Sequence, residues 1–177
     1  DWSPEVRLCY LRRSGKDEVY GIPCPQGLIF DPDPDGWRNP VAASIRPDDF
    51  VQVEFTYPEE EFAIVVSPDG EWFVSTMTGQ SAANQFAVNS VLNALQLVVS
   101  SGFATEEEAS ALNFAVPDAM VRIVTSEDAA SPTTRLRFLD RDDAAMYLAI
   151  PSRSTVFIID RRVLFGLLLS SKDFRED

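Results

Sequence analysis

The feature that most constrains the fold of this chain is a run of apolar and polar residues in strand-like order between positions 50 and 75. From Phe50 to Tyr57 the odd-numbered residues are all apolar, which is the period of a strand buried on one face. An apolar segment follows at 62–66, and residues 67–70 (Ser-Pro-Asp-Gly) form a tight-turn sequence before a third segment at 71–75. We therefore predict a three-stranded antiparallel meander.

The periodicity changes to that of a helix after this meander. Between Ser81 and Ser101, apolar residues recur at spacings of three and four, and Gly102 stands where a helix C-cap is expected. Thr105 and Glu108 have the spacing of a capping box, which predicts that a second helix begins there and ends before Pro117. Together these two segments predict a helical hairpin.

The remaining segments are mostly strand-like. We expect an N-terminal hairpin over residues 5–22, which turns near Ser14-Gly15, and a brief strand at 41–45. The C-terminal part contains four further strand-like segments, at 119–125, 134–139, 145–150 and 155–159. A helical turn beginning at Asp142 is an alternative for the start of the third of these. A leucine stripe over 162–171 predicts a closing helix.

These segments predict an α+β fold. Its antiparallel sheet combines the N-terminal meander with the C-terminal strands, and it packs against the central helical hairpin and the C-terminal helix. No glycine-serine linker divides the 177 residues, so we expect one domain. Its parts are a β-rich region at 1–77, the helical hairpin at 78–116, and strands with the closing helix at 117–177.

The formal net charge of −13 is unevenly distributed along the chain. Residues 1–118 contain nine Asp and ten Glu against five Arg and one Lys, whereas residues 119–177 contain nine charges of each sign. Such a balance argues against nucleic acid and anionic membranes as partners, because both require clustered basic residues. It favours a basic protein partner. Since thirteen of the fifteen basic residues are Arg, a GC-rich or salt-adapted source is an alternative explanation of the acidity.

The chain contains no histidine and two cysteines, Cys9 and Cys24. Without histidine, Ser-His-Asp and Cys-His catalysis are excluded, as are most zinc sites. Two cysteines do not make a disulfide framework, and neither a secretory signal nor a membrane span is visible. We therefore expect a non-enzymatic cytoplasmic protein; because the chain begins at Asp1, a cleaved leader stays open.

The loop from Asp31 to Gly36 is the one local pattern that matches a metal-binding template. Asp31, Asp33 and Asp35 alternate as calcium ligands do at the start of an EF-hand loop. However, the twelfth position is Ala42 instead of Glu, and prolines occupy the second and fourth positions. We interpret the loop as an exposed turn, with calcium binding as the alternative.

Other acidic residues extend this loop into a candidate partner-binding surface. Glu106–Glu108 and the Asp140–Asp143 segment are explained instead as helix and turn caps. The main hypothesis is a module that binds a basic protein, of the inhibitor, immunity, adaptor or secretion-chaperone type, with Trp37 as an aromatic anchor. A calcium-binding domain and a metal-dependent hydrolase are the alternatives. The predicted partner-binding residues are Asp31, Asp33, Asp35, Trp37, Asp48, Asp49, Glu59, Glu60 and Glu61.

Overall fold

The computed structural model describes residues 8–12, 15–23, 38–126 and 133–175. The chain forms two compact units, Asp1–Arg38 and Asn39–Asp177. The first unit contains the predicted N-terminal hairpin, in which β1 (Leu8–Arg12) pairs antiparallel with β2 (Val19–Pro23). The single-domain organisation stays a prediction.

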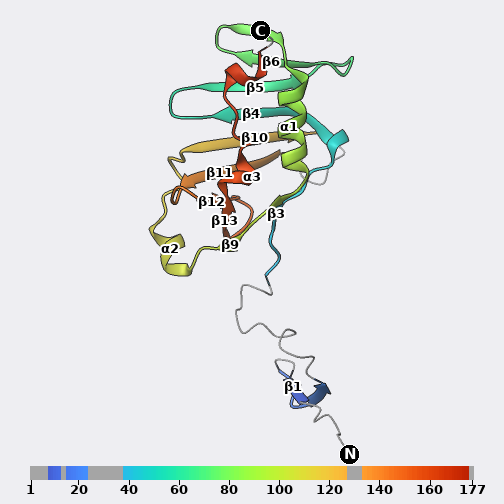
Figure 1. Ribbon diagram of the computed structural model, residues 1–177, viewed down its shortest axis with the longest axis vertical. Coiled ribbons are helices and arrows are strands. Elements are labelled where there is room, and N and C mark those ends of the chain that lie inside the picture. Colours follow the sequence, from blue (N-terminus) through green and yellow to red (C-terminus); the bar gives the residue numbers. More distant parts are fainter. Residues whose placement is uncertain (1–7, 13–14, 24–37, 127–132, 176–177) are drawn as a thin grey trace, which may run out of the picture. The chain divides into compact units, whose positions relative to one another are not determined.

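The second unit is built on an antiparallel sheet whose nine described strands have the order β7-β6-β5-β4-β10-β11-β12-β13-β9 (Figure 1). Two shorter strands, β3 (Val41–Ala43) and β8 (Val98–Val99), pair separately. The strands of the large sheet are β4 (Phe50–Thr56), β5 (Glu61–Val66), β6 (Trp72–Thr76), β7 (Gly79–Ala82), β9 (Gly102–Phe103), β10 (Ala119–Thr125), β11 (Thr133–Asp140), β12 (Ala145–Ala149) and β13 (Val156–Asp160).

The sheet confirms the predicted α+β class and the predicted meander. β4, β5 and β6 are consecutive antiparallel neighbours, and β7 extends them by a fourth strand. The N-terminal and C-terminal strands meet where β4 pairs with β10, with Val53 opposite Ile123. Alternation predicts each of these strands by itself, but it contains no information about which strand is the neighbour of which.

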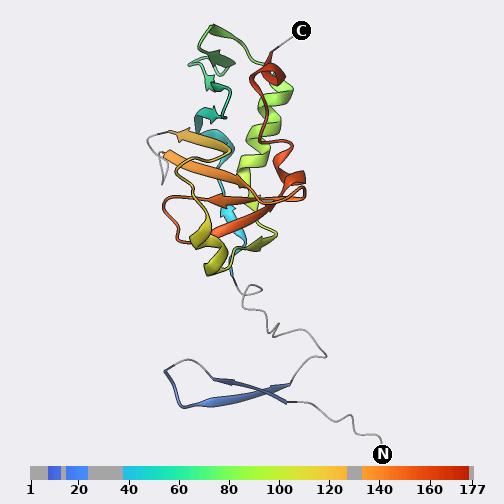
Figure 2. The ribbon, with the colours of Figure 1, turned by 90° about the vertical axis from the view of Figure 1, so that its left-hand side faces the viewer.

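One face of the sheet is covered by α1 (Gln85–Gln96) and by the C-terminal segment, which includes α3 (Arg161–Leu164) and η3 (Ser171–Phe174) (Figures 1 and 2). Asn84 caps α1, since its side-chain oxygen accepts the N–H groups of residues 86 and 87 at 2.9 and 3.2 Å. Phe174 is fully buried and lies 5.8 Å from Phe55 and 5.6 Å from Phe62 between ring centroids. The core thus joins the end of the chain to the central strands.

The predicted helical hairpin is wrong, although both of its helices exist. α1 ends at Gln96, and the following residues form β8 and β9 instead of continuing the helix. Gly102 is therefore not a helix cap, because it pairs with Ile158 of β13. The second helix, α2 (Glu106–Ala111), begins with the predicted capping box. The β-branched residues before Gly102 gain more from pairing with neighbouring strands than from another helical turn.

The predicted closing helix over 162–171 is also wrong, because α3 ends at Leu164. Gly166 lies against α1, where an added Cβ would approach the Ser90 hydroxyl to 3.0 Å. The chain turns at this point, where the N–H groups of Leu167 and Leu168 both donate to the Leu164 carbonyl. The leucine stripe is real, but packing against α1 favours a turn over an extended helix.

Candidate functional site

Four of the predicted partner-binding residues, Asp31, Asp33, Asp35 and Trp37, lie outside the described residues, as does Cys24. The calcium-binding role of the three aspartates therefore stays a prediction. Within the described part of the chain, no group of three or more acidic or cysteine side chains is placed to share a metal ion.

The five described candidates separate into two groups at opposite ends of β4. Asp48 and Asp49 belong to η2 (Pro47–Asp49), directly before the strand, whereas Glu59 and Glu60 occupy the turn that follows it and Glu61 begins β5. The seven residues of β4 hold these groups about 23 Å apart, at roughly 3.3 Å per residue. The structure therefore does not bring the two groups together.

Asp49 is engaged within its own end of the sheet. Its carboxylate accepts hydrogen bonds from Arg46 Nε at 3.0 Å and Nη2 at 3.2 Å. This contact raises the pKa of Arg46 above its ordinary value. The same end contains a hollow of about 340 Å³ lined by Arg46, Asp49 and Arg153, together with hydroxyl side chains. Arg153 is engaged there as well, since its Nη1 donates to the Val41 carbonyl at 2.8 Å.

Glu59–Glu61 lie at the end of the sheet where other carboxylates gather. β4 and β11 end there, while β5, β10 and β12 begin there, so their connecting segments are neighbours (Figure 1). We call this group the acidic rim. Most of its members are exposed, and it combines carboxylates from both chain halves: Glu59, Glu60, Glu61, Asp118, Asp140, Asp142 and Asp143.

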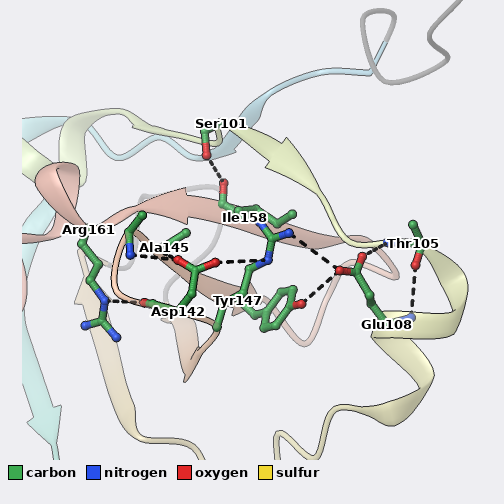
Figure 3. A network of polar contacts seen from close by, with 10 residues as sticks. Ser101, Thr105, Glu108, Asp142, Ala145, Tyr147, Ile158 and Arg161 are labelled. Carbon is green, nitrogen blue, oxygen red and sulfur yellow. Dashed lines mark hydrogen bonds and ion pairs between the residues drawn. The ribbon is translucent and has the colours of Figure 1, made fainter.

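The C-terminal part of the acidic rim is a fixed turn. The Asp118 carboxylate accepts a hydrogen bond from the Asp140 N–H at 2.7 Å. The Asp140 carboxylate accepts one from Arg161 Nη2 at 2.8 Å. Asp142 accepts the N–H groups of Ala144 and of Ala145, the first residue of β12, at 2.8 and 2.9 Å (Figure 3). This geometry confirms that the segment caps a turn and excludes the alternative helical turn.

A second contact network attaches α2 beside this turn. The Glu108 carboxylate accepts the Thr105 N–H at 2.8 Å and the Tyr147 hydroxyl at 3.2 Å (Figure 3). Arg141 Nη2 lies 3.8 Å from the same carboxylate, and its guanidinium lies 5.6 Å from the Tyr147 ring centroid. The hydrogen bond from Thr105, followed by the contacts with Tyr147 and Arg141, lowers the pKa of Glu108. Sequence spacing predicts the capping box but contains no signal for Tyr147.

Glu60 has a structural role within the acidic rim. Its carboxylate accepts the Ser171 N–H at 3.4 Å, which joins the β4–β5 turn to the C-terminal segment. Nearby, the Tyr57 hydroxyl donates to the Leu169 carbonyl at 2.8 Å, and burial raises the pKa of Tyr57 well above its ordinary value. Glu59 and Glu61 are exposed, so they are the rim carboxylates of this turn that a partner can reach.

No helix within the described ranges is both long and apolar enough to cross a membrane. Neither a curated protein nor a solved structure matches the chain. The sequence profile of one family, described as "Domain of unknown function (DUF4340)", matches residues 3–117. This range covers more than half of the chain and ends before β10, so the C-terminal strands of the sheet lie beyond it.

Proposed function

We propose that this chain, which belongs to the DUF4340 family, is a non-enzymatic module that binds a basic protein partner through the acidic rim. The observation that carries the proposal is the gathering of carboxylates from both chain halves at one end of the sheet. Carboxylates concentrated on one surface attract a cationic partner and increase the rate of association.

The ion pairs around the acidic rim support this role. Its nearby cations, Arg141 and Arg161, already contact rim or α2 carboxylates. Glu59, Glu61 and Asp143 are exposed. A partner that supplies Lys or Arg to these three positions meets uncompensated negative charge, while the capped turn holds part of the surface in a fixed geometry. An inhibitor, immunity protein, adaptor or secretion-type chaperone would use such a surface.

Site-specific photo-crosslinking in the source cells tests the proposal. A photoreactive amino acid at position 59 or 143 should capture a basic protein, because both positions lie in the acidic rim. The same amino acid at Asp69, in the exposed turn at the other end of β5, is the matched control. Capture from the rim alone supports the proposal. No capture, equal capture from the control position, or an acidic captured protein would overturn it.

Neutralising the acidic rim sharpens this experiment. Glu59→Gln with Glu61→Gln and Asp143→Asn should weaken binding to the captured protein by about tenfold or more and reduce its salt dependence. Asp69→Asn with Glu71→Gln removes charge from the opposite end of the sheet and should leave binding unchanged. If both sets of substitutions have the same effect, net charge is responsible and not the acidic rim.

Calcium binding by Asp31, Asp33 and Asp35 is the alternative proposal, and it is supported by the sequence pattern alone. A ligand that binds the native state must stabilise it, so calcium should raise the melting temperature relative to a chelator. Asp33→Asn should abolish that shift. A melting temperature that is equal in calcium and in chelator removes this alternative.

A further inference from the structure

Strand β7 forms one edge of the large sheet, and no other described strand pairs with its outer side. All four of its residues are exposed. The Ala83 N–H donates to the Trp72 carbonyl at 2.9 Å. The direction of the backbone groups alternates along a strand, so those of Ser81, two residues earlier, also face β6. Antiparallel pairing therefore directs the backbone N–H and C=O groups of Gln80 and Ala82 outward. Such a row of outward groups is a template for another strand.

The opposite edge of the sheet is shorter. β9 contains two residues, and the flanking residues Ser101 and Ala104 donate to β13 at 2.8 and 3.0 Å. The chain then continues directly into α2, whose capping residue is Thr105. Among the described strands, β7 is therefore the longer open edge.

The sequence that contains and flanks β7 is uncharged, in a chain with 24% charged residues. Residues 72–105 contain no Asp, Glu, Lys or Arg, although charged side chains and prolines are the usual protection of a sheet edge. Met77 and Phe86, on either side of β7, are 95% and 85% exposed. A hollow of about 490 Å³ lies beside β6 and β7, and among the described residues Arg175 is the one charged residue that lines it.

We propose that the β7 edge pairs with the β7 edge of a second copy of this chain. Two copies that each carry a net charge of −13 repel one another, and an uncharged edge is where they approach at the least electrostatic cost. A basic protein has no such reason to prefer this edge. When the same patch of both copies forms the contact, the two copies are related by a two-fold axis and the assembly stops at a dimer.

The outward groups determine the register of the pair. Hydrogen-bonded positions must match, and the register that pairs both outward residues of β7 places Gln80 of one copy opposite Ala82 of the other. Ser81 then lies at the two-fold axis opposite Ser81 of the second copy, in a non-hydrogen-bonded pair with a Cα separation of about 4.5 Å. The two sheets become one continuous sheet across the dimer.

Sedimentation of the 177-residue chain from micromolar to near-millimolar concentration tests the proposal. We expect a concentration-dependent rise to twice the mass of 19.7 kDa. Ser81→Glu and Ser81→Lys should each increase the dimer dissociation constant by about tenfold or more, because either sign of charge meets itself at the axis. Ser154→Glu and Ser154→Lys, in the exposed β12–β13 turn, are the matched controls and should have no effect.

A cysteine at the axis provides the second readout. In a background with Cys9→Ser and Cys24→Ser, Ser81→Cys should form an intermolecular disulfide under mild oxidation, and Ser154→Cys should not. Ala82→Pro removes an outward N–H and should also prevent dimerisation, while circular dichroism checks that each variant is folded. A monomer at every concentration, equal effects at positions 81 and 154, or opposite effects of Ser81→Glu and Ser81→Lys would each overturn the proposal.

Discussion

The two faces of the large sheet differ in what covers them. On one face, Val53 and Phe55 of β4 are fully buried beneath α1 and the C-terminal segment. On the other face, Glu54 of the same strand stays partly exposed and pairs with Arg122 of β10. Among the described residues, a smaller apolar cluster packs there around Tyr147, with Ala104, Leu112 and Phe114 from the segments that flank α2.

This difference shows that one alternating strand has two physical roles. Residues that point to the covered face are removed from water, and their burial supplies most of the stability. Residues that point to the open face stay solvated, so their ion pairs contribute less per contact. We therefore expect substitutions on the covered face to have the larger effects, and four predictions test this expectation.

The largest effect should come from Phe174→Ala on the covered face. Phe174 is fully buried against Phe55 and Phe62, so its truncation should lower the free energy of unfolding by about 3–5 kcal/mol. Phe73→Ala, on the open face where the ring is half-buried, is the matched control and should cost about 1–2 kcal/mol. Urea denaturation measures both, and equal costs would contradict the comparison.

A smaller effect should follow from Glu54→Gln on the open face. Arg122 Nη1 lies 2.7 and 2.9 Å from the two Glu54 carboxylate oxygens, while the two side chains remain 36% and 25% exposed. Because solvent screens the pair, we expect a loss of about 1 kcal/mol. A double-mutant cycle with Arg122→Gln measures the coupling, and a coupling above about 3 kcal/mol would show that this face is covered too.

Alkaline pH should lower the free energy of unfolding through Tyr57, which lies at the edge of the covered face. Burial raises the pKa of this hydroxyl in the folded protein, so the unfolded chain loses its proton first as pH rises. Stability should therefore fall from about pH 10 upward, by at most about 1.4 kcal/mol per pH unit. Tyr57→Phe cannot ionise and should flatten this part of the pH profile. An unchanged profile in the variant would contradict the assignment.

An effect of the same size, but confined to one helix, should come from the cap of α2. Thr105→Ala removes the acceptor of the Glu108 N–H, at 3.2 Å, and should cost about 1 kcal/mol, felt mainly by α2. The pKa of Glu108 is lowered in the folded state, so its contribution is present above its ordinary value and is lost as pH falls through the folded pKa. Hydrogen exchange in α2 should accelerate at acidic pH. The Glu108→Gln variant should lose that dependence.

Sequence patterns predicted the fold where one element contains its own signal. The alternation in β4 and β10 and the capping box of α2 are local, and the structure has them where the sequence indicates. The ends of α1 and α3 were missed, because partners outside those segments determine them: β13 pairs with Gly102, and α1 packs against Gly166.

The candidate site was less predictable than the fold. Charge counted along the sequence places the negative excess before residue 119, yet the acidic rim includes Asp140, Asp142 and Asp143 from the balanced part of the chain. Their nearest basic residues are engaged in ion pairs, which no count of charges reveals. Residues that are distant in sequence gather because neighbouring antiparallel strands begin and end at the same side of a sheet.

The sequence by itself determined the longer strands of the sheet and their apolar faces, and it placed α1 and α2, but it did not predict β7, β8 or β9. Periodicity and capping depend on side chains within a few positions of one another, so they can be read from the chain. Only the tertiary structure decided that β4 pairs with β10, that the acidic rim is composite, and that β7 is an open edge. Those features depend on the free energy gained when segments that are distant in sequence bury their surfaces against one another. That free energy does not depend on neighbouring residues in the sequence, so no local sequence pattern reveals it.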